Sequence, residues 1–211
     1  AVKTVKEGAT DFVVKPWDNA KLIATLLSAY RLRQSQTEVK QLREKEVELK
    51  KQLTSGEELI WGDSPVMQQL HRLIEKVAST DANILITGEN GTGKEMIAKE
   101  LHRLSKRNKE VMIGVDMGAI TETLFESELF GHVKGAFTDA KEDRAGKFEA
   151  ANKGTLFLDE IGNLTYSLQS KLLAAIQSRQ ITRIGSNKPI DIDIRLICAT
   201  NSNLQEMVAK G

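Results

Sequence analysis

The sequence predicts an α/β fold, a parallel sheet with flanking helices, preceded by one long helix. From about Leu59 onward, short apolar runs alternate with helical segments, and strands separated by helices form parallel sheets that are covered on both faces. Before that point, residues 18–55 contain neither glycine nor proline, which favours a continuous helix. The net charge of the 211 residues is +1, so charge gives no reason to expect nucleic acid or a membrane as the partner.

The N-terminal part is predicted to contain the end of a helix, a turn at Gly8 and a strand over Asp11–Lys15 that Pro16 closes. Asp18 is a good N-cap for the long helix. Its apolar residues fall on heptad a and d positions, which Ser35 and Glu46 interrupt. These apolar residues are Leu32, Val39, Leu42, Leu49 and Leu53. A dimeric coiled coil is favoured, and a solvated single helix that joins two domains is the alternative.

The second part is predicted to alternate helices with strands. The pair Ser64-Pro65 caps and opens the first helix. The expected helices are Pro65–Val77, Lys94–Leu104 and Leu168–Ser178, and another begins near the C-terminus. The expected strands are Asn83–Thr87, Val111–Val115, Thr155–Asp159 and Ile192–Thr200.

No apolar run approaches the roughly 20 residues of a bilayer span, and no secretory leader opens the chain. The lone cysteine, Cys198, cannot form an internal disulfide, so we expect a reducing, cytoplasmic location and a buried, inert thiol. His71, His102 and His132 lack metal-ligand spacing and are expected on the surface or on helix faces. Trp17 and Trp61 are expected to pack at domain junctions rather than to stack on bases.

A phosphate-binding motif lies between an apolar strand and a helix. Its spacing is G-x-x-x-x-G-K, the pattern of a P-loop, whereas a flexible glycine-rich connector would need neither flanking element. Backbone amides would surround the phosphates of ATP, and the lysine would neutralise their charge. The residues expected at the nucleotide are Gly88, Glu89, Asn90, Gly91, Thr92, Gly93, Lys94 and Glu95. Glu95 replaces the usual Ser or Thr that contacts magnesium.

Two acidic residues end the strand KGTLFLDE. Asp159 lies where a P-loop protein holds Mg²⁺, and Glu160 could orient or deprotonate the attacking water. Asn201 ends a neighbouring strand, where its side chain could bind the γ-phosphate or the water. An isolated acidic pair is more often solvated, and a terminal asparagine is more often a turn residue. The P-loop context therefore carries the functional interpretation.

Between these motifs, the segments ESELFGH and GAFTDA, followed by GTLFLDE, resemble the AAA+ domain of the sigma-54-dependent transcription activators in order and spacing. The resemblance covers about residues 59–211, and glutamate after the P-loop lysine is usual there. It implies an ATPase that forms a ring, commonly a hexamer, and remodels the closed complex of RNA polymerase with sigma-54. The implied sigma-54 contact residues are Gly135, Ala136, Phe137, Thr138, Asp139 and Ala140.

The resemblance also implies a second loop over Gln180–Ile190. Asp139 departs from the usual glycine of the hexapeptide. Asp116 stands where relatives often have an asparagine that positions the catalytic glutamate, and we expect it to keep a hydrogen-bonding role.

The segment GATDFVVKPW resembles the end of a two-component receiver domain, with Lys15-Pro16 as its lysine-proline pair. We therefore expect a receiver end over residues 1–30, a helical linker over 31–57 and the ATPase domain over 58–211 of a response regulator. The phosphoacceptor aspartate, the trans-acting arginines and a DNA-binding helix-turn-helix would lie outside this chain, which by itself should turn over little ATP. A nucleotide-regulated scaffold and a clamp-loader relative are the competing hypotheses, and the hexapeptide disfavours both.

Overall fold

The computed structural model describes residues 16, 18–54 and 61–210 of the chain. The chain divides into two compact units, Ala1–Leu49 and Lys50–Gly211. The expected strand over Asp11–Lys15 and the expected packing of Trp17 lie outside the described residues.

Helix α2 (Asn19–Thr54) is the long helix that the sequence predicts. The side chain of Asp18 accepts a hydrogen bond of 2.8 Å from the amide of Ala20, so Asp18 caps the helix as expected. The helix passes the expected domain boundary at residue 30 without a break. Three of the heptad residues, Leu32, Val39 and Leu42, are 47%, 45% and 59% exposed.

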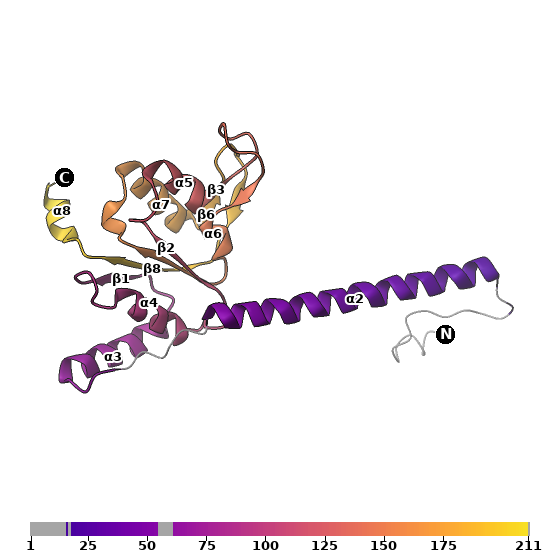
Figure 1. Ribbon diagram of the computed structural model, residues 1–211, viewed down its shortest axis with the longest axis horizontal. Coiled ribbons are helices and arrows are strands. Elements are labelled where there is room, and N and C mark those ends of the chain that lie inside the picture. Colours follow the sequence, from indigo (N-terminus) through magenta and orange to yellow (C-terminus); the bar gives the residue numbers. More distant parts are fainter. Residues whose placement is uncertain (1–15, 17, 55–60, 211) are drawn as a thin grey trace. The chain divides into compact units, whose positions relative to one another are not determined.

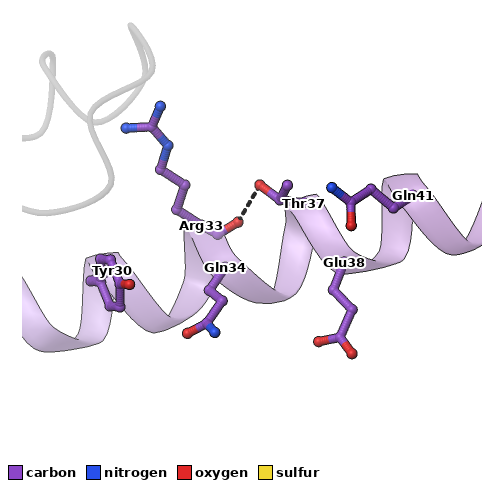
Figure 2. Close-up of a pocket in the computed structure, with 6 residues that line it drawn as sticks. All are labelled: Tyr30, Arg33, Gln34, Thr37, Glu38 and Gln41. Carbon is purple, nitrogen blue, oxygen red and sulfur yellow. Dashed lines mark hydrogen bonds between the residues drawn. The ribbon is translucent and has the colours of Figure 1, made fainter.

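A hollow on α2 is lined by six residues of this one helix, Tyr30, Arg33, Gln34, Thr37, Glu38 and Gln41 (Figure 2). The bond drawn there is a local one of 2.9 Å, from the Thr37 hydroxyl to the Arg33 carbonyl. Arg33 and Glu38 point to opposite sides of the helix, so their charges do not converge on a ligand (Figure 2).

The central sheet has four strands, β1 (Ile84–Thr87), β2 (Met112–Asp116), β5 (Thr155–Asp159) and β8 (Arg195–Thr200), in the order β1-β8-β5-β2. Every neighbouring pair is parallel, which confirms the predicted fold class. The register pairs Thr87 with Thr200 and Asp116 with Asp159, so the carboxyl ends of all the strands meet at one edge.

Helices cover both faces of the sheet (Figure 1). On one face, α3 (Pro65–Ala78) and α4 (Lys94–Arg103) form a core with Phe157 and Ile197. The opposite face packs Leu156 and Leu158 against three helices. These are α5 (Glu122–Phe130), α6 (Lys147–Ala150) and α7 (Tyr166–Ser178).

The remaining elements are short. They are the hairpin of β3 (Gly131–His132) with β4 (Arg144–Ala145), the hairpin of β6 (Gln180–Thr182) with β7 (Pro189–Asp191), the 3₁₀ turn η1 (Ile161–Asn163) and helix α8 (Leu204–Lys210). None of the helices in the described residues combines the length and the apolar character of a membrane span.

Three sequence expectations about boundaries and burial can be compared with the structure. The last strand begins at Arg195 rather than Ile192, because the amide of Ile192 bonds the Arg179 carbonyl and the amide of Asp193 bonds the side chain of Asn152. Burial raises the pKa of the Cys198 thiol to about 12, as an inert thiol requires. Trp61 packs against His71, with ring centroids 4.6 Å apart.

The expectation that each histidine lies on the surface or on a helix face is met by His71 on α3 and by His102, which lies on α4 although it is only 4% exposed, and it is wrong for His132, which lies in β3 and is 8% exposed. One ring nitrogen of His102 lies 2.8 Å from the Thr155 hydroxyl and the other 3.2 Å from the Glu110 carbonyl oxygen. Burial lowers the pKa of His102. A neutral imidazole with both nitrogens satisfied can be buried at little cost.

Charged groups close the amino end of the sheet. Arg107 donates to the carboxylates of Asp81 and Asp193, at 3.2 and 2.8 Å, and to the Lys153 carbonyl oxygen at 3.2 Å. Arg195 is fully buried and donates to the carbonyls of Val77 and Ala78, each at 3.0 Å, at the end of α3. The loops before β1, β5 and β8 are thereby tied together.

Candidate functional site

The P-loop joins β1 to α4 at the carboxyl edge of the sheet (Figure 1). Gly91 and Gly93 have φ angles of 79° and 85°, a left-handed conformation that only glycine adopts without strain. Gly93 is the N-cap of α4, so the positive end of the helix dipole faces the P-loop. The hydroxyl of Thr92 donates to the Glu89 carbonyl at 2.8 Å and fixes the turn around the exposed Asn90.

Lys94 is the first residue of α4, and its side chain is only 7% exposed. Its ammonium donates to the carbonyls of Gly88 and Glu89 at 3.0 and 3.2 Å. The chain of the lysine therefore folds back over the loop, which holds the ammonium at the place where a phosphate would be bound.

The acidic pair at the end of β5 lies beside this lysine. The Glu160 carboxylate is 3.7 Å from the Lys94 ammonium and accepts a long hydrogen bond of 3.4 Å from the amide of Asn201. One oxygen of Asp159 accepts the amide of Glu160 at 3.0 Å. The structure thus brings together the P-loop, the tip of β5 and the tip of β8, as the sequence predicts.

Glu160 has φ and ψ angles of 55° and 47°. A left-handed conformation costs a residue other than glycine about 1–2 kcal/mol. This conformation turns the chain sharply at the end of β5, and the Glu160 carboxylate lies beside the Lys94 ammonium. Nothing in the sequence indicates this conformation.

Thr200 is a site residue that the sequence analysis missed. It is fully buried, its carbonyl accepts the amide of Gly88 at 3.2 Å, and its hydroxyl accepts the amide of Ser202 at 3.1 Å. It therefore joins the start of the P-loop to the end of β8. A hydroxyl residue that closes the apolar run of β8 is the signal that could have identified it.

Glu95 and Asp116 depart from the general motifs, and the structure shows the contacts that each side chain makes. Glu95 forms an ion pair of 2.8 Å with Lys99 on the exposed side of α4. Asp116 lies next to Asp159 in the sheet, and its side chain accepts the amide of Gly118 at 2.8 Å.

The carboxylates at this edge suit Mg²⁺, which needs few protein ligands, better than a metal ion that is bound by protein side chains alone. Among the described residues, no three His, Cys, Asp or Glu side chains could hold a metal ion together. Mg²⁺ is usually bound by one or two carboxylates together with phosphate oxygens and water. Asp159 offers such a carboxylate next to the P-loop.

The hexapeptide Gly135–Ala140 forms a closed turn between β3 and β4. The amide of Gly135 donates to the Ala140 carbonyl at 2.8 Å, and the amide of Ala140 donates to the Phe137 carbonyl at 3.0 Å. Phe137 is 41% exposed, and its ring meets the ring of His132 edge-on with centroids 4.9 Å apart. Thr138 and Asp139 are exposed at the tip, whereas Ala140 is buried.

The second expected loop lies against this turn. The hairpin β6–β7 carries Gly185, and a side chain there would lie 2.7 Å from the Cβ atom of Ala136. The amide of Val133 donates to the Ile184 carbonyl at 3.1 Å. The two loops therefore form one exposed surface, as expected from the resemblance.

Comparison with known proteins gives consistent results. A family model described as the sigma-54 interaction domain matches residues 60–211. The chain is 44% identical to the transcriptional regulatory protein ZraR of Salmonella typhimurium, over all of this chain and 46% of that protein. It is 44% identical to the regulatory protein AtoC of Escherichia coli K12, over all of this chain and 45% of that protein. It is 40% identical to the DNA-binding transcriptional regulator NtrC of the same organism, over all of this chain and 43% of that protein.

The chain therefore spans about half the length of the curated relatives that it matches. Among solved structures, it is similar to NtrX of Brucella abortus in complex with ADP, with a TM-score of 0.67 and 33% identity over all of this chain and 45% of that chain. The parallel sheet, the P-loop and these matches agree. The chain belongs to the sigma-54 interaction domain family, whose fold is the α/β fold of the P-loop AAA+ proteins.

Proposed function

We propose that this chain binds ATP with Mg²⁺ at the carboxyl edge of its sheet and that the full-length protein hydrolyses the ATP to activate transcription by sigma-54 RNA polymerase. The observation that carries the proposal is the approach of Glu160 to Lys94 across the P-loop, at 3.7 Å. Solved structures of the relative NtrX contain ADP and ATP, which supports a nucleotide as the ligand.

Each residue has a distinct role in this proposal. The backbone amides of Gly88–Lys94 bind the phosphates, and the Lys94 ammonium neutralises the charge that develops on them. Asp159 holds Mg²⁺, which polarises the phosphate when it is bound. Glu160 accepts a proton from the attacking water, and Asn201, which begins at the tip of β8, contacts the γ-phosphate.

Asp116 fits a supporting role. Its carboxylate is fixed by the amide of Gly118 at the strand position next to Asp159. We propose that it helps to orient the acidic pair, as the asparagine of its relatives would.

The test is the Glu160→Gln variant of the full-length protein. Glutamine keeps the size and one acceptor but cannot take a proton, so ATP turnover should fall by about 10²-fold or more while nucleotide affinity remains. Glu75→Gln, an exposed glutamate of α3, is the control and should keep wild-type turnover. Normal hydrolysis by Glu160→Gln would refute the catalytic role and would favour a nucleotide-regulated scaffold.

We propose that the hexapeptide contacts sigma-54 through Phe137 and Thr138, with the neighbouring β6–β7 hairpin at its side. The exposure of an aromatic ring on a projecting turn supports this, because such a ring contributes little to the core. Thr138→Ala should abolish binding to sigma-54 and spare ATP hydrolysis. Lys141→Ala, an exposed position just beyond the hexapeptide, should retain binding, and retained binding by Thr138→Ala would remove the assignment.

We propose further that the chain is part of a cytoplasmic response regulator, with a receiver end over residues 1–30, a linker over 31–57 and the ATPase domain over 58–211. The exposed residues Leu32, Val39 and Leu42 on α2 support a dimeric coiled coil, and the ATPase domains would assemble into a hexameric ring. Leu32→Glu combined with Leu42→Glu should dissociate the dimer in sedimentation experiments if the coiled coil forms.

A further inference from the structure

The turn that follows Glu160 lies unusually close to the tip of β8. Gly162 is the middle residue of η1. A Cβ atom at Gly162 would lie 2.5 Å from the Ser202 hydroxyl oxygen, 3.0 Å from the Ser202 Cβ atom and 3.1 Å from the Thr200 hydroxyl oxygen. Rotation of the Ser202 hydroxyl would relieve the 2.5 Å contact, but the Ser202 Cβ atom is fixed by the backbone, so a side chain at position 162 requires η1 or the tip of β8 to give by a few tenths of an ångström.

The backbone conformation gives no separate reason for glycine here. Gly91 and Gly93 have positive φ angles, but Gly162 does not. An alanine at position 162 would therefore meet no backbone strain of its own, and the close approach to β8 is what requires the glycine.

This contact lies next to the proposed catalytic residues on both sides. Glu160 precedes the turn, and its carbonyl accepts the amide of Asn163 at 3.0 Å, so the position of η1 fixes the position of Glu160. On the other side, Asn201 lies between Thr200 and Ser202, the two residues that a Cβ atom at Gly162 would meet. The Glu160 carboxylate reaches the amide of Asn201 across the same gap, at 3.4 Å.

We propose that Gly162 is a positioning residue, which sets the distance between the Glu160 carboxylate and Asn201 by letting the turn lie directly on Thr200 and Ser202. This inference rests on the proposed role of Glu160. A displacement of η1 by a few tenths of an ångström would move the carboxylate away from the water that it must reach, without touching the P-loop.

The first variant is Gly162→Ala in the full-length protein. We expect kcat for ATP hydrolysis to fall about tenfold, because small displacements of a catalytic group cost much of its rate. The KM for ATP and the affinity for ADP should change less than about twofold, since the amides of the P-loop and Lys94 keep their places. Gly114→Ala is the matched control, because its Cβ atom would lie 3.8 Å from the Phe157 ring, an ordinary contact.

The decisive comparison repeats Gly162→Ala in a Ser202→Gly background. Removal of the Ser202 side chain removes two of the three close contacts, so the cost of Gly162→Ala should shrink to about twofold there, whatever Ser202→Gly costs alone. If Gly162→Ala fails to fold by itself, the double variant should fold and hydrolyse ATP within about twofold of the rate of Ser202→Gly.

An equal loss of kcat in both backgrounds would overturn the inference, and so would a Gly162→Ala variant with a normal kcat. Both results leave the proposed function standing if Glu160→Gln is inactive in the same assay. Normal turnover by Glu160→Gln would instead remove the proposed function and this inference together.

Discussion

The two ends of the same sheet both collect charged side chains, but they use them differently. At the amino end, Arg107 and Arg195 bond carboxylates and carbonyls at 2.8–3.2 Å in the bonds that tie the loops together. At the carboxyl end, Glu160 reaches its partners only at 3.4 and 3.7 Å. The amino end is a network of short hydrogen bonds, whereas Glu160 at the carboxyl end is held by longer contacts.

This difference shows that a shifted pKa is a poor guide to the functional site in this protein. The hydrogen bond from Arg107 lowers the pKa of Asp81, and burial lowers the pKa values of His102 and Arg195. These groups all lie at the amino end, where they support the fold. Structural networks perturb pKa values as catalytic sites do, so the geometry of the P-loop is the better indicator here.

The largest expected effect is a loss of stability, with nucleotide binding unchanged, when the network at the amino end is broken. Arg107→Ala removes the bonds to Asp81, Asp193 and the Lys153 carbonyl from a side chain that is 14% exposed. We expect the free energy of unfolding to fall by about 2–4 kcal/mol in urea denaturation, with nucleotide affinity unchanged. Arg72→Ala, at an exposed position of α3, should cost less than about 0.5 kcal/mol. A loss of nucleotide affinity in Arg107→Ala without a loss of stability would break the comparison.

A smaller effect is expected at the carboxyl end. Gly93→Ala introduces a Cβ atom at a φ angle of 85°, which costs about 1 kcal/mol and turns the loop amides away from the phosphates. Affinity for ATP should fall about tenfold in calorimetric titrations. Gly62→Ala, whose Cβ atom would lie 3.9 Å from Met67, should bind like the wild type. Equal affinities for the two variants would mean that the loop amides do not bind the ligand.

The smallest effect concerns pH. Burial lowers the pKa of His102 in the folded state below its ordinary value of 6.5, so the unfolded chain takes up the proton more readily. The contribution of neutral His102 is present above about pH 6.5 and is lost as the pH falls toward the folded pKa. The free energy of unfolding should therefore fall as the pH is lowered from about 7.5 to about 5.5. His102→Asn should reduce that slope, and an unchanged slope would contradict the assignment.

The features that sequence alone could predict are those that local pattern determines. The P-loop, the strand before the acidic pair and helix α2 each depend on neighbouring residues, and each was found where it was expected. The convergence of Lys94, Glu160 and Asn201 also followed, because parallel strands bring their carboxyl ends to one edge.

The features that could not be predicted depend on contacts between distant residues. The close approach of Gly162 to Ser202 exists because β5 and β8 are neighbours, and the left-handed conformation of Glu160 has no signal in the sequence. His102 is buried because Thr155 and Glu110 satisfy its ring. The hairpin of β3 with β4 has strands of two residues each, too short for any periodicity to appear.

The most direct test of the carboxyl end as a nucleotide site is the affinity of the full-length protein for ATP with Mg²⁺ when Lys94 is replaced by alanine. Lys99→Ala is the matched control, because Lys99 lies on the exposed side of the same helix and pairs with Glu95. We expect Lys94→Ala to weaken binding about a hundredfold or more and Lys99→Ala to bind within about twofold of the wild type. Wild-type affinity in Lys94→Ala would contradict the account.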